Sequence, residues 1–531
     1  MMSSKPSYPS EGTDSRILRG YCGSESSAVR PKLYLGPGPV PRRYLAEDKC
    51  LVAEAIPKQP PQRDVHGMGP IGKQGVNLDQ GKCVPPPSVN VPANTQTPNP
   101  TTFTIPLSPI FTKHQPSDAI KTLNSLASSS LTRAHHLKHP KSKPPLTKTK
   151  VFSHSYGGYS ISLSFGTPPQ TISFLLDTGS SPVWFPCTSQ YFCTDCHIDP
   201  SKIPLFIPKL SSSSKFIGCQ NPNCARISSS NSLSGCQGCN CSQACPYFFE
   251  YGIGSTNGLL LSETLGFSEK RFTNFLVGCS IFSTTQPPAG TAGFGRTLES
   301  LPSQLGLSKF SYCLISQRFN DTSESSDLVL YRGSSSDAKT PGLSYTPFRK
   351  NPSFFPEFYY VDLLKVIVGS KSVNIPYKYL VPENNANGNG GTIVDSGTTF
   401  TTMEKPIFGA VATAFEAEMG NFTRASADVE ASTGTNLCFN ITGLKFEKIK
   451  FPELTFEFKG GAKMELPVVN YFVPVDVGNS SLVCLTIMTG STVDSVGPAI
   501  VLGNTQQQNF YVEFDLKNDR FGFRKQTCNK K

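Results

Sequence analysis

The chain has 531 residues, of which 37% are hydrophobic and 16% charged, and a formal net charge of +11 at pH 7. This length favours two domains with an appendage over a single small core, and few charges with 44 glycines and 45 prolines favour strands over helices. The charge does not indicate nucleic-acid binding, because residues 151–531 carry 29 basic and 29 acidic side chains and contain no nucleic-acid-reading motif.

Residues 1–100 are rich in proline and glycine and lack a periodic apolar pattern, which is typical of a disordered or artefactual extension. The first thirty residues contain no apolar run that would mark a signal peptide, and no run of 18 apolar residues predicts a membrane span. We therefore expect residues 1 to about 100 to lie outside the functional protein, and an authentic transcript to begin with an apolar signal segment.

Residues 101–150 carry eight basic side chains and one acidic one, Asp118. The segment SDAIKTLNSLASSSLTRAHHLKH predicts a short helix that begins near Ser117 or Asp118. It is followed by KHPKSKPPLTKTK, in which the prolines exclude a helix. We interpret residues 101–150 as a basic leader and linker.

From residue 151 the chain consists of short β-branched or aromatic segments separated by glycine, proline and asparagine, which predicts a mostly β body. Helical patterns are brief and lie around residues 300–306 and 405–419. Examples of the expected strands are YSISLSFG, TISFLLDTG, YVDLLKVIVG and FYVEFDLKNDRFGF.

A coarse internal repeat divides this body. SFLLDTGSS (173–181) is similar to GTIVDSGTT (391–399), and each is followed by a second apolar element that ends in glycine, GTAGFGR and AIVLGN. The repeat predicts two lobes, residues 151–345 and 346–531, with one carboxylate from each lobe at a shared site.

In each repeat an apolar strand runs directly into Asp-Thr-Gly or Asp-Ser-Gly, so the aspartate is expected to be buried. Burying a carboxylate costs free energy unless it finds hydrogen-bond partners. The glycine permits a turn that brings backbone N–H groups back to the carboxylate, and Ser180 and Thr398 occupy the same offset from Asp177 and Asp395. One such motif is often only a strand-ending turn, but two in similar flanks predict a paired-carboxylate site.

These motifs resemble those of the pepsin-like aspartic proteases over about residues 155–528. The resemblance implies a mostly β, bilobal fold with a few short helices and a cleft between two pseudo-twofold-related lobes. It implies that Asp177 and Asp395 activate a water that hydrolyses peptide bonds in proteins at acidic pH, without a cofactor, in a monomer that acts on polypeptide substrates. Supporting roles would fall to both triplets: Thr178 and Ser396 would cross-brace the loops, Ser180 and Thr398 would orient the carboxylates, and Gly179 and Gly397 would complete the turns.

The segment FFEYGIGSTNGLLLSETL (248–265) resembles the flap hairpin that closes over substrate in this family, with Tyr251 at its tip. Trp184, the single tryptophan, matches the family position that hydrogen-bonds the flap tyrosine. Ile253 departs from the polar residue often found there, so the resemblance does not extend to flap behaviour or substrate preference, whereas the chemistry is unaffected.

Fourteen cysteines lie between Cys187 and Cys528. Two CxxC pairs, Cys193/Cys196 and Cys236/Cys239, would suit zinc, but disulfides fit the accompanying glycosylation sequons better, so we expect no metal. The cluster resembles the cysteine-rich insertion of nepenthesin-like plant proteases, which implies Cys313–Cys528 and Cys438–Cys484 bridges. The other expected disulfide cysteines, whose pairing stays open, are Cys187, Cys193, Cys196, Cys219, Cys224, Cys236, Cys239, Cys241, Cys245 and Cys279.

Five Asn-X-Ser/Thr sequons accompany these cysteines and favour a secretory route to the extracellular space or cell wall, with the vacuole as the alternative. The expected glycosylation sites are Asn240, Asn320, Asn421, Asn440 and Asn479. The body contains two histidines, His154 and His197, and neither is placed for a Ser-His-Asp arrangement.

Two functions remain open on the sequence: an active endopeptidase, and an inactive protein of the same fold that binds and inhibits glycoside hydrolases. Both Asp triplets, Thr398 and Tyr251 are intact, which favours the protease. In pepsin-like zymogens a basic leader blocks the cleft, so we expect residues 101–150 to do so at neutral pH and to be trimmed below about pH 5.

Overall fold

The structure is a computed structural model, and it describes twelve stretches of the chain. These are residues 101–109, 119–138, 157–196, 203–230, 243–252, 254–267, 270–287, 289–316, 325–332, 339–383, 388–490 and 497–528. Our predictions for residues 1–100 and for the linker after residue 138 lie outside the described residues.

Strands dominate the described chain, as expected. Those of the first half are β1 (Thr101–Pro109), β2 (Tyr159–Phe165), β3 (Gln170–Asp177), β4 (Val183–Pro186), β5 (Phe192–Thr194), β6 (Lys215–Phe216), β7 (Pro246–Glu250), β8 (Ser255–Phe267), β9 (Lys270–Thr284), β10 (Gly290–Gly293), β11 (Leu307–Cys313), β12 (Ser326–Arg332) and β13 (Ser344–Pro347). Those of the second half are β14 (Tyr360–Val361), β15 (Leu363–Val368), β16 (Lys371–Val373), β17 (Thr392–Val394), β18 (Thr401–Met403), β19 (Cys438–Asn440), β20 (Leu454–Phe458), β21 (Lys463–Leu466), β22 (Phe472–Val477), β23 (Ser480–Leu485), β24 (Ile487–Met488), β25 (Ile500–Leu502), β26 (Phe510–Asp515) and β27 (Arg520–Lys525).

Helices are fewer than strands in the described chain, and the three that the sequence predicts are confirmed as α1, α3 and α5. The helices are α1 (Ala119–Lys138), α2 (Pro222–Ser230), α3 (Leu301–Leu305), α4 (Tyr377–Leu380), α5 (Lys405–Glu418), α6 (Ala427–Thr433) and α7 (Asn504–Gln507), with 3-10 turns at Pro208–Leu210, Phe446–Lys448 and Val468–Asn470. Helix α5 buries Ile407, Val411 and Phe415, which recur every four residues and form one apolar face.

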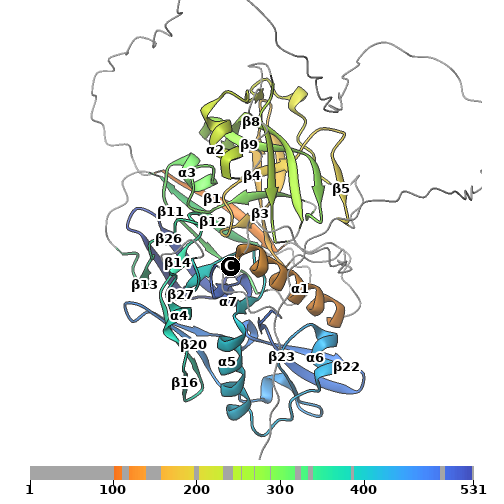
Figure 1. The fold of residues 1–531 in the computed structure, drawn as a ribbon, viewed down its shortest axis with the longest axis vertical. Coiled ribbons are helices and arrows are strands. Elements are labelled where there is room, and N and C mark those ends of the chain that lie inside the picture. Colours follow the sequence, from red (N-terminus) through yellow and green to blue (C-terminus); the bar gives the residue numbers. More distant parts are fainter. Residues whose placement is uncertain are drawn as a thin grey trace, which may run out of the picture. The chain divides into compact units, whose positions relative to one another are not determined.

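A 15-stranded sheet contains all the strands of the first half, in the order β13-β27-β26-β11-β12-β1-β2-β3-β10-β4-β9-β8-β6, with β5 and β7 at its side. Three smaller sheets, β14-β17-β25-β18-β24, β16-β15-β20-β21 and β19-β23-β22, form the second lobe. The last strands, β26 and β27, return to β11 and β13 and so join the lobes (Figure 1). The bilobal, mostly β fold expected from the sequence is confirmed.

The internal repeat is also confirmed, because its two copies pair in the same way. Strand β3 lies parallel to β10, with Asp177 opposite Gly293. Strand β17 lies parallel to β25, and the backbone N–H of Asp395 donates to the carbonyl of Leu502 at 3.1 Å. Each lobe therefore holds its aspartate at the end of a buried strand supported by the second element of the repeat.

The structure contains both implied disulfides, Cys313–Cys528 and Cys438–Cys484. It also pairs Cys187 with Cys279, Cys193 with Cys196, and Cys224 with Cys245. The first CxxC pair is thus a disulfide in the structure. Cys219 is buried and its pairing stays a prediction, while Cys236, Cys239 and Cys241 lie outside the described residues.

Two of the expected glycosylation sites, Asn421 and Asn479, are exposed, and Asn440 is partly buried. Asn240, Asn320, His154, His197 and Ile253 lie outside the described residues. In the part of the chain that the structure describes, no helix is both long enough and apolar enough to cross a membrane.

Candidate active site

The two aspartates of the repeat lie at the junction of the lobes and are fully buried. The hydroxyl of Ser180 donates to Asp177 at 2.5 Å, and that of Thr398 donates to Asp395 at 2.6 Å. Within each triplet the glycine backbone N–H donates to the other carboxylate oxygen, at 2.9 Å in the first loop and 2.8 Å in the second. The loops therefore supply the partners that a buried carboxylate requires.

A reciprocal brace holds the two loops together. The hydroxyl of Thr178 donates to the carbonyl of Val394 at 3.1 Å and accepts the backbone N–H of Ser396 at 2.9 Å. The hydroxyl of Ser396 donates to the carbonyl of Leu176 at 2.9 Å and accepts the backbone N–H of Thr178 at 3.1 Å. Because every bond has a counterpart across the junction, the relative position of the two carboxylates is defined from both lobes.

The glycines of the triplets allow the carboxylates to approach each other. A Cβ atom on Gly179 would lie 2.5 Å from the carboxyl carbon of Asp395, and one on Gly397 would lie 2.4 Å from Oδ1 of Asp177. Any other residue would displace the opposite aspartate, so the two loops can face each other only with glycine at these positions.

A third charged group, Arg133 of α1, lies between the aspartates. Its Nη2 donates to both carboxylate oxygens of Asp177, at 2.8 and 3.0 Å, and its Nε donates to Oδ2 of Asp395 at 3.3 Å. The side chain of Arg133 is only 8% exposed. The guanidinium thus binds both members of the pair at once, which its planar array of donors permits.

The charge of residues 101–150 predicts a basic leader at the cleft but does not single out Arg133. It is the single arginine among residues 101–150, and the other seven basic residues there are lysines. Because only arginine presents several donors in a fixed plane, a single arginine among lysines was the sequence feature that could have marked the residue that binds both carboxylates. A cavity of about 50 Å³ remains beside Arg133, lined by α1, the Tyr251 region and the Gln286 loop.

Burial raises the pKa of Asp177 above its ordinary value, and the neighbouring Asp395 raises it further, while Arg133 acts in the opposite direction. For Arg133, burial lowers the pKa, but the two carboxylates outweigh this and raise it above its ordinary value. The arginine therefore remains charged throughout the pH range in which Asp177 takes up its proton.

Comparisons with known proteins agree with this geometry. Two family models match the chain, "Xylanase inhibitor N-terminal" over residues 159–330 and "Xylanase inhibitor C-terminal" over residues 358–525. Nepenthesin-1, an aspartic proteinase of Nepenthes gracilis, is 33% identical over 390 residues, which are 72% of this chain and 81% of the relative. A probable aspartyl protease of Arabidopsis thaliana is 32% identical over 420 residues, 70% of this chain and 82% of the relative.

The chain belongs to the pepsin-like aspartic protease family. Solved structures share its fold: edgp has a TM-score of 0.52 at 20% identity, covering 80% of this chain and 94% of its own. The soybean basic 7S globulin has a TM-score of 0.51 at 17% identity, covering 80% of this chain and 97% of its own.

Next to the aspartates, β7 and β8 form the hairpin that resembles the flap of pepsin-like proteases. The backbone N–H of Tyr251 donates to the carbonyl of Gly254 and closes the turn. The indole N–H of Trp184 donates to the hydroxyl of Tyr251 at 2.8 Å, and both rings are buried. The position of the hairpin tip is thus linked to β4, which lies beside the strand pair that carries Asp177.

Replacing Tyr251 by phenylalanine tests this link, since it removes one hydroxyl and keeps the ring. The buried indole N–H of Trp184 loses its partner, which costs about 1–3 kcal/mol. We expect kcat/KM on a peptide substrate to fall about tenfold. Steady-state kinetics beside a thermal melt distinguish the roles: lower stability with unchanged kcat/KM would make Tyr251 a structural residue only.

A further carboxyl group, that of Glu357, lies near this site in the loop before β14. Burial raises its pKa to about 7, with Glu299 raising and Arg133 lowering it. Its backbone carbonyl accepts the N–H of Arg296 at 2.9 Å, which attaches the loop to the first lobe. Glu357 therefore adds a negative charge near Arg133 that is lost as the pH falls below about 7.

Proposed function

We propose that this protein is an aspartic endopeptidase that hydrolyses peptide bonds in polypeptides at acidic pH, with Asp177 and Asp395 as its catalytic residues. The observation that supports it most is the pair of buried carboxylates that face each other across the braced loops. Two carboxylates this close do not both ionise cheaply, so the pair holds one proton over a range of acidic pH.

The chemistry follows from that shared proton. The ionised aspartate accepts a proton from a water, which attacks the scissile carbonyl, while the protonated aspartate donates to the developing oxyanion. The C–N bond then breaks as the aspartate that accepted the proton of the water passes it to the leaving amine, while a hydroxyl proton of the tetrahedral intermediate returns to the other aspartate. No covalent intermediate with the protein is formed. The Ser180 and Thr398 hydroxyls and the glycine N–H groups hold the carboxylates in position during this exchange.

The same proposal treats residues 101–150 as a leader that keeps the enzyme latent. Arg133 occupies the position between the aspartates that water and substrate would need. A chain segment tethered in this way competes with substrate at high effective concentration. The disulfides and exposed sequons of the body fit secretion to the extracellular space or cell wall, with the vacuole as alternative, and a monomer suffices because both aspartates come from one chain.

The competing function is that of an inactive protein of this fold that inhibits glycoside hydrolases, which the names of the two matching family models suggest. The assay that separates them is cleavage of acid-denatured globin by the full chain at pH 3–5, with and without pepstatin. Pepstatin-sensitive cleavage is the expected result. No cleavage, together with inhibition of a xylanase by the same preparation, would favour the inhibitor.

A further inference from the structure

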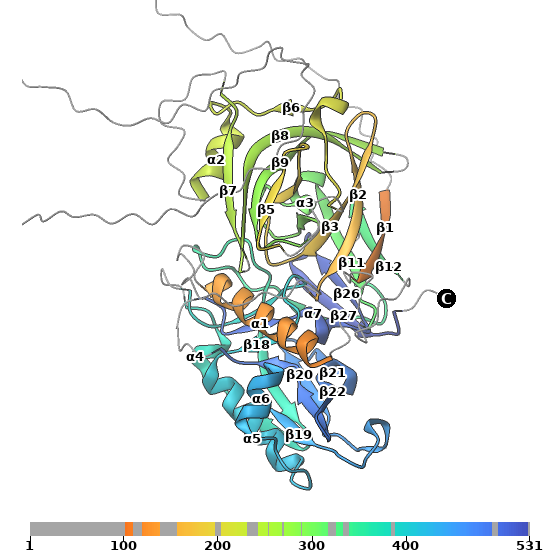
Figure 2. The same ribbon diagram turned by 90° about the vertical axis from the view of Figure 1, so that its right-hand side faces the viewer.

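Helix α7 has the sequence Asn-Thr-Gln-Gln, and all four of its polar residues are buried. Figures 1 and 2 both place this helix where the two lobes meet. A buried amide group costs free energy unless it is hydrogen-bonded, so these side chains are expected to hold specific partners. The first of them, Asn504, contacts the loop that carries Asp395.

The side-chain amide of Asn504 joins two carbonyl groups. Its Nδ2 donates to the carbonyl of Ser396 at 3.0 Å and to the carbonyl of Gly157 at 2.8 Å. Ser396 follows Asp395 directly, and its N–H and hydroxyl groups already belong to the brace with the first loop. The bond from Asn504 therefore holds the remaining polar group of Ser396, its carbonyl.

Gly157, which supplies the other carbonyl, also lies against the Asp395 loop. Its backbone has a φ of 55°, and a Cβ atom there would lie 2.4 Å from the side chain of Thr399. Only glycine combines this conformation with so close an approach. The start of the body before β2 therefore supports the loop in two ways, by direct packing on Thr399 and through Asn504.

The internal repeat offers a comparison within the chain. In the first lobe the glycine opposite the aspartate, Gly293, is followed by Phe294, whereas in the second lobe Gly503 is followed by Asn504. Phe294 is fully buried and its side chain has no hydrogen-bond donor. The brace between the loops is reciprocal, but only the second lobe has a side-chain amide at this position.

We infer that Asn504 is a positioning residue for the aspartate pair, because it fixes the Ser396 carbonyl against the start of the body and thereby sets the position of the Asp395 carboxylate. The inference rests on the proposed protease function. Without the amide, the Ser396 carbonyl loses its buried partner and the loop shifts toward another donor. Proton transfer between water, substrate and two carboxylates is sensitive to displacements of about 1 Å. Loss of the amide therefore lowers kcat, whereas KM, which reflects contacts along the rest of the cleft, changes little.

Gln506 of the same helix is a matched reference for Asn504. It is equally buried, but its hydrogen bonds go to a different part of the second lobe. Its Oε1 accepts the backbone N–H of Thr401 at 2.9 Å, and its Nε2 donates to the carbonyls of Asn470 at 2.7 Å and Thr486 at 3.2 Å. Replacing Gln506 thus removes a comparable set of buried bonds while leaving the Ser396 carbonyl bound.

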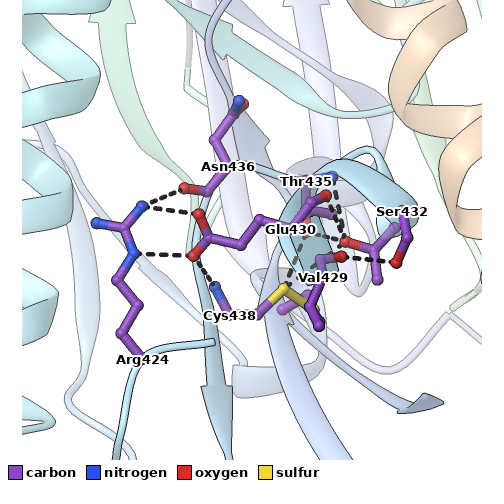
Figure 3. The surroundings of a disulfide bond; sticks show 9 residues. Arg424, Val429, Glu430, Ser432, Thr435, Asn436 and Cys438 are labelled. Carbon is purple, nitrogen blue, oxygen red and sulfur yellow. Dashed lines mark hydrogen bonds and ion pairs between the residues drawn. A yellow bond between two sulfur atoms is a disulfide. The ribbon is translucent and has the colours of Figure 1, made fainter. Parts of the chain in front are cut away.

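The strands that Gln506 contacts are held in place independently of it. Figure 3 shows the guanidinium of Arg424 facing the carboxylate of Glu430, with both bonds at 2.8 Å. Glu430 also accepts the backbone N–H of Cys438 at 3.1 Å, and Cys438 forms a disulfide with Cys484 of β23, two residues before Thr486. Replacing Gln506 is therefore expected to lower stability without displacing the Asp395 loop.

Hydrogen exchange followed by mass spectrometry tests the bond from Asn504 without catalysis, on the full chain at pH 7. Asn504→Leu nearly keeps the volume of the side chain and removes its donors. We expect the amides of residues 395–399 to exchange at least about tenfold faster in Asn504→Leu than in wild type, and to change less than about twofold in Gln506→Met. Protection of β15 shows in every sample that the second lobe is folded.

Steady-state kinetics on the acid-treated full chain at pH 3 test the catalytic consequence, at equal concentrations of folded protein. We expect kcat of Asn504→Leu to fall at least about thirtyfold with KM within about threefold of wild type, and kcat of Gln506→Met to stay within about threefold. Asn504→Asp keeps the shape, and a protonated carboxyl group donates one hydrogen bond. Its kcat should lie within about fivefold of wild type at pH 3 and fall further behind wild type by pH 5.5, because the ionised carboxylate has no donor.

The outcomes separate the inference from the proposed function. The inference is overturned if residues 395–399 exchange equally in wild type and Asn504→Leu, or if kcat falls no more in Asn504→Leu than in Gln506→Met. Equal rates for Asn504→Asp and Asn504→Leu at pH 3 would also contradict it, since the donor would then have no effect. If Asn504→Leu does not fold, the pH dependence of Asn504→Asp decides. A wild type that cleaves no globin would overturn the proposed function, while the exchange measurement would still show whether Asn504 holds the loop.

Discussion

Replacing Asp177 or Asp395 by asparagine is expected to reduce cleavage of denatured globin at least about a thousandfold in either variant. An amide neither shares nor transfers the proton that the carboxylate pair holds. Asparagine has nearly the same size and keeps an oxygen that accepts the glycine N–H of its own triplet, so the loops and their brace remain in place. Initial rates after acid treatment, measured at equal concentrations of folded protein, give the comparison.

The control is Asp428→Asn, which removes a carboxylate from the exposed surface of α6 and should leave the rate unchanged. Near-ultraviolet circular dichroism and the thermal midpoint establish that the active-site variants are folded. If either variant kept a tenth or more of the wild-type rate, the corresponding aspartate would not be catalytic. If both variants kept a tenth or more of the wild-type rate, the paired-carboxylate mechanism would be wrong.

The features that the sequence could predict are those that repeat or that have strong local patterns. Asp177 and Asp395 stand out because similar apolar flanks surround both triplets, and a second apolar element follows each triplet; the parallel pairing of these elements is a finding of the structure. Helix α5 was predictable from the spacing of Ile407, Val411 and Phe415. These signals lie within short windows, where residue order reflects local geometry.

Features that depend on distant partners were not predictable. Strand β1 lies between β2 and β12, and its seven residue pairs with β12 are separated by more than two hundred positions. Pro106 and Pro109 argue against a strand in the interior of a sheet, because proline has no backbone N–H to donate to a neighbouring strand. Arg133 is the single arginine of residues 101–150, but its role depends on two carboxylates from different lobes, which that composition alone does not reveal.

The full chain is expected to be latent at neutral pH and to trim itself below about pH 5, and we expect Arg133 to set this threshold. The titratable groups that interact with its guanidinium are Asp177, Asp395, Tyr251 and Glu357. As the pH falls, Asp177 and Glu357, whose pKa values are raised by burial, take up protons, while Arg133 stays charged. The attraction that holds α1 over the cleft is therefore strongest at neutral pH and weakens on acidification.

Arg133→Ala removes this attraction and leaves the buried carboxylates without their counter-charge, which typically costs about 3–5 kcal/mol. The second half of α1 then no longer excludes ligands from the aspartates. We expect pepstatin affinity at pH 7 to rise at least about tenfold and self-trimming to begin nearer to neutrality.

The pepstatin affinity and trimming pH of Arg133→Lys should lie between those of wild type and Arg133→Ala, because an ammonium group has no planar array of donors to bind both carboxylates. Lys445→Ala removes an exposed positive charge from the body and serves as the control for net charge. If Arg133→Ala matched wild type in both pepstatin affinity and trimming pH, the ion pairs at the aspartates would not maintain latency. Latency would then depend on the other contacts of the leader with the body, those of β1 and of the first half of α1.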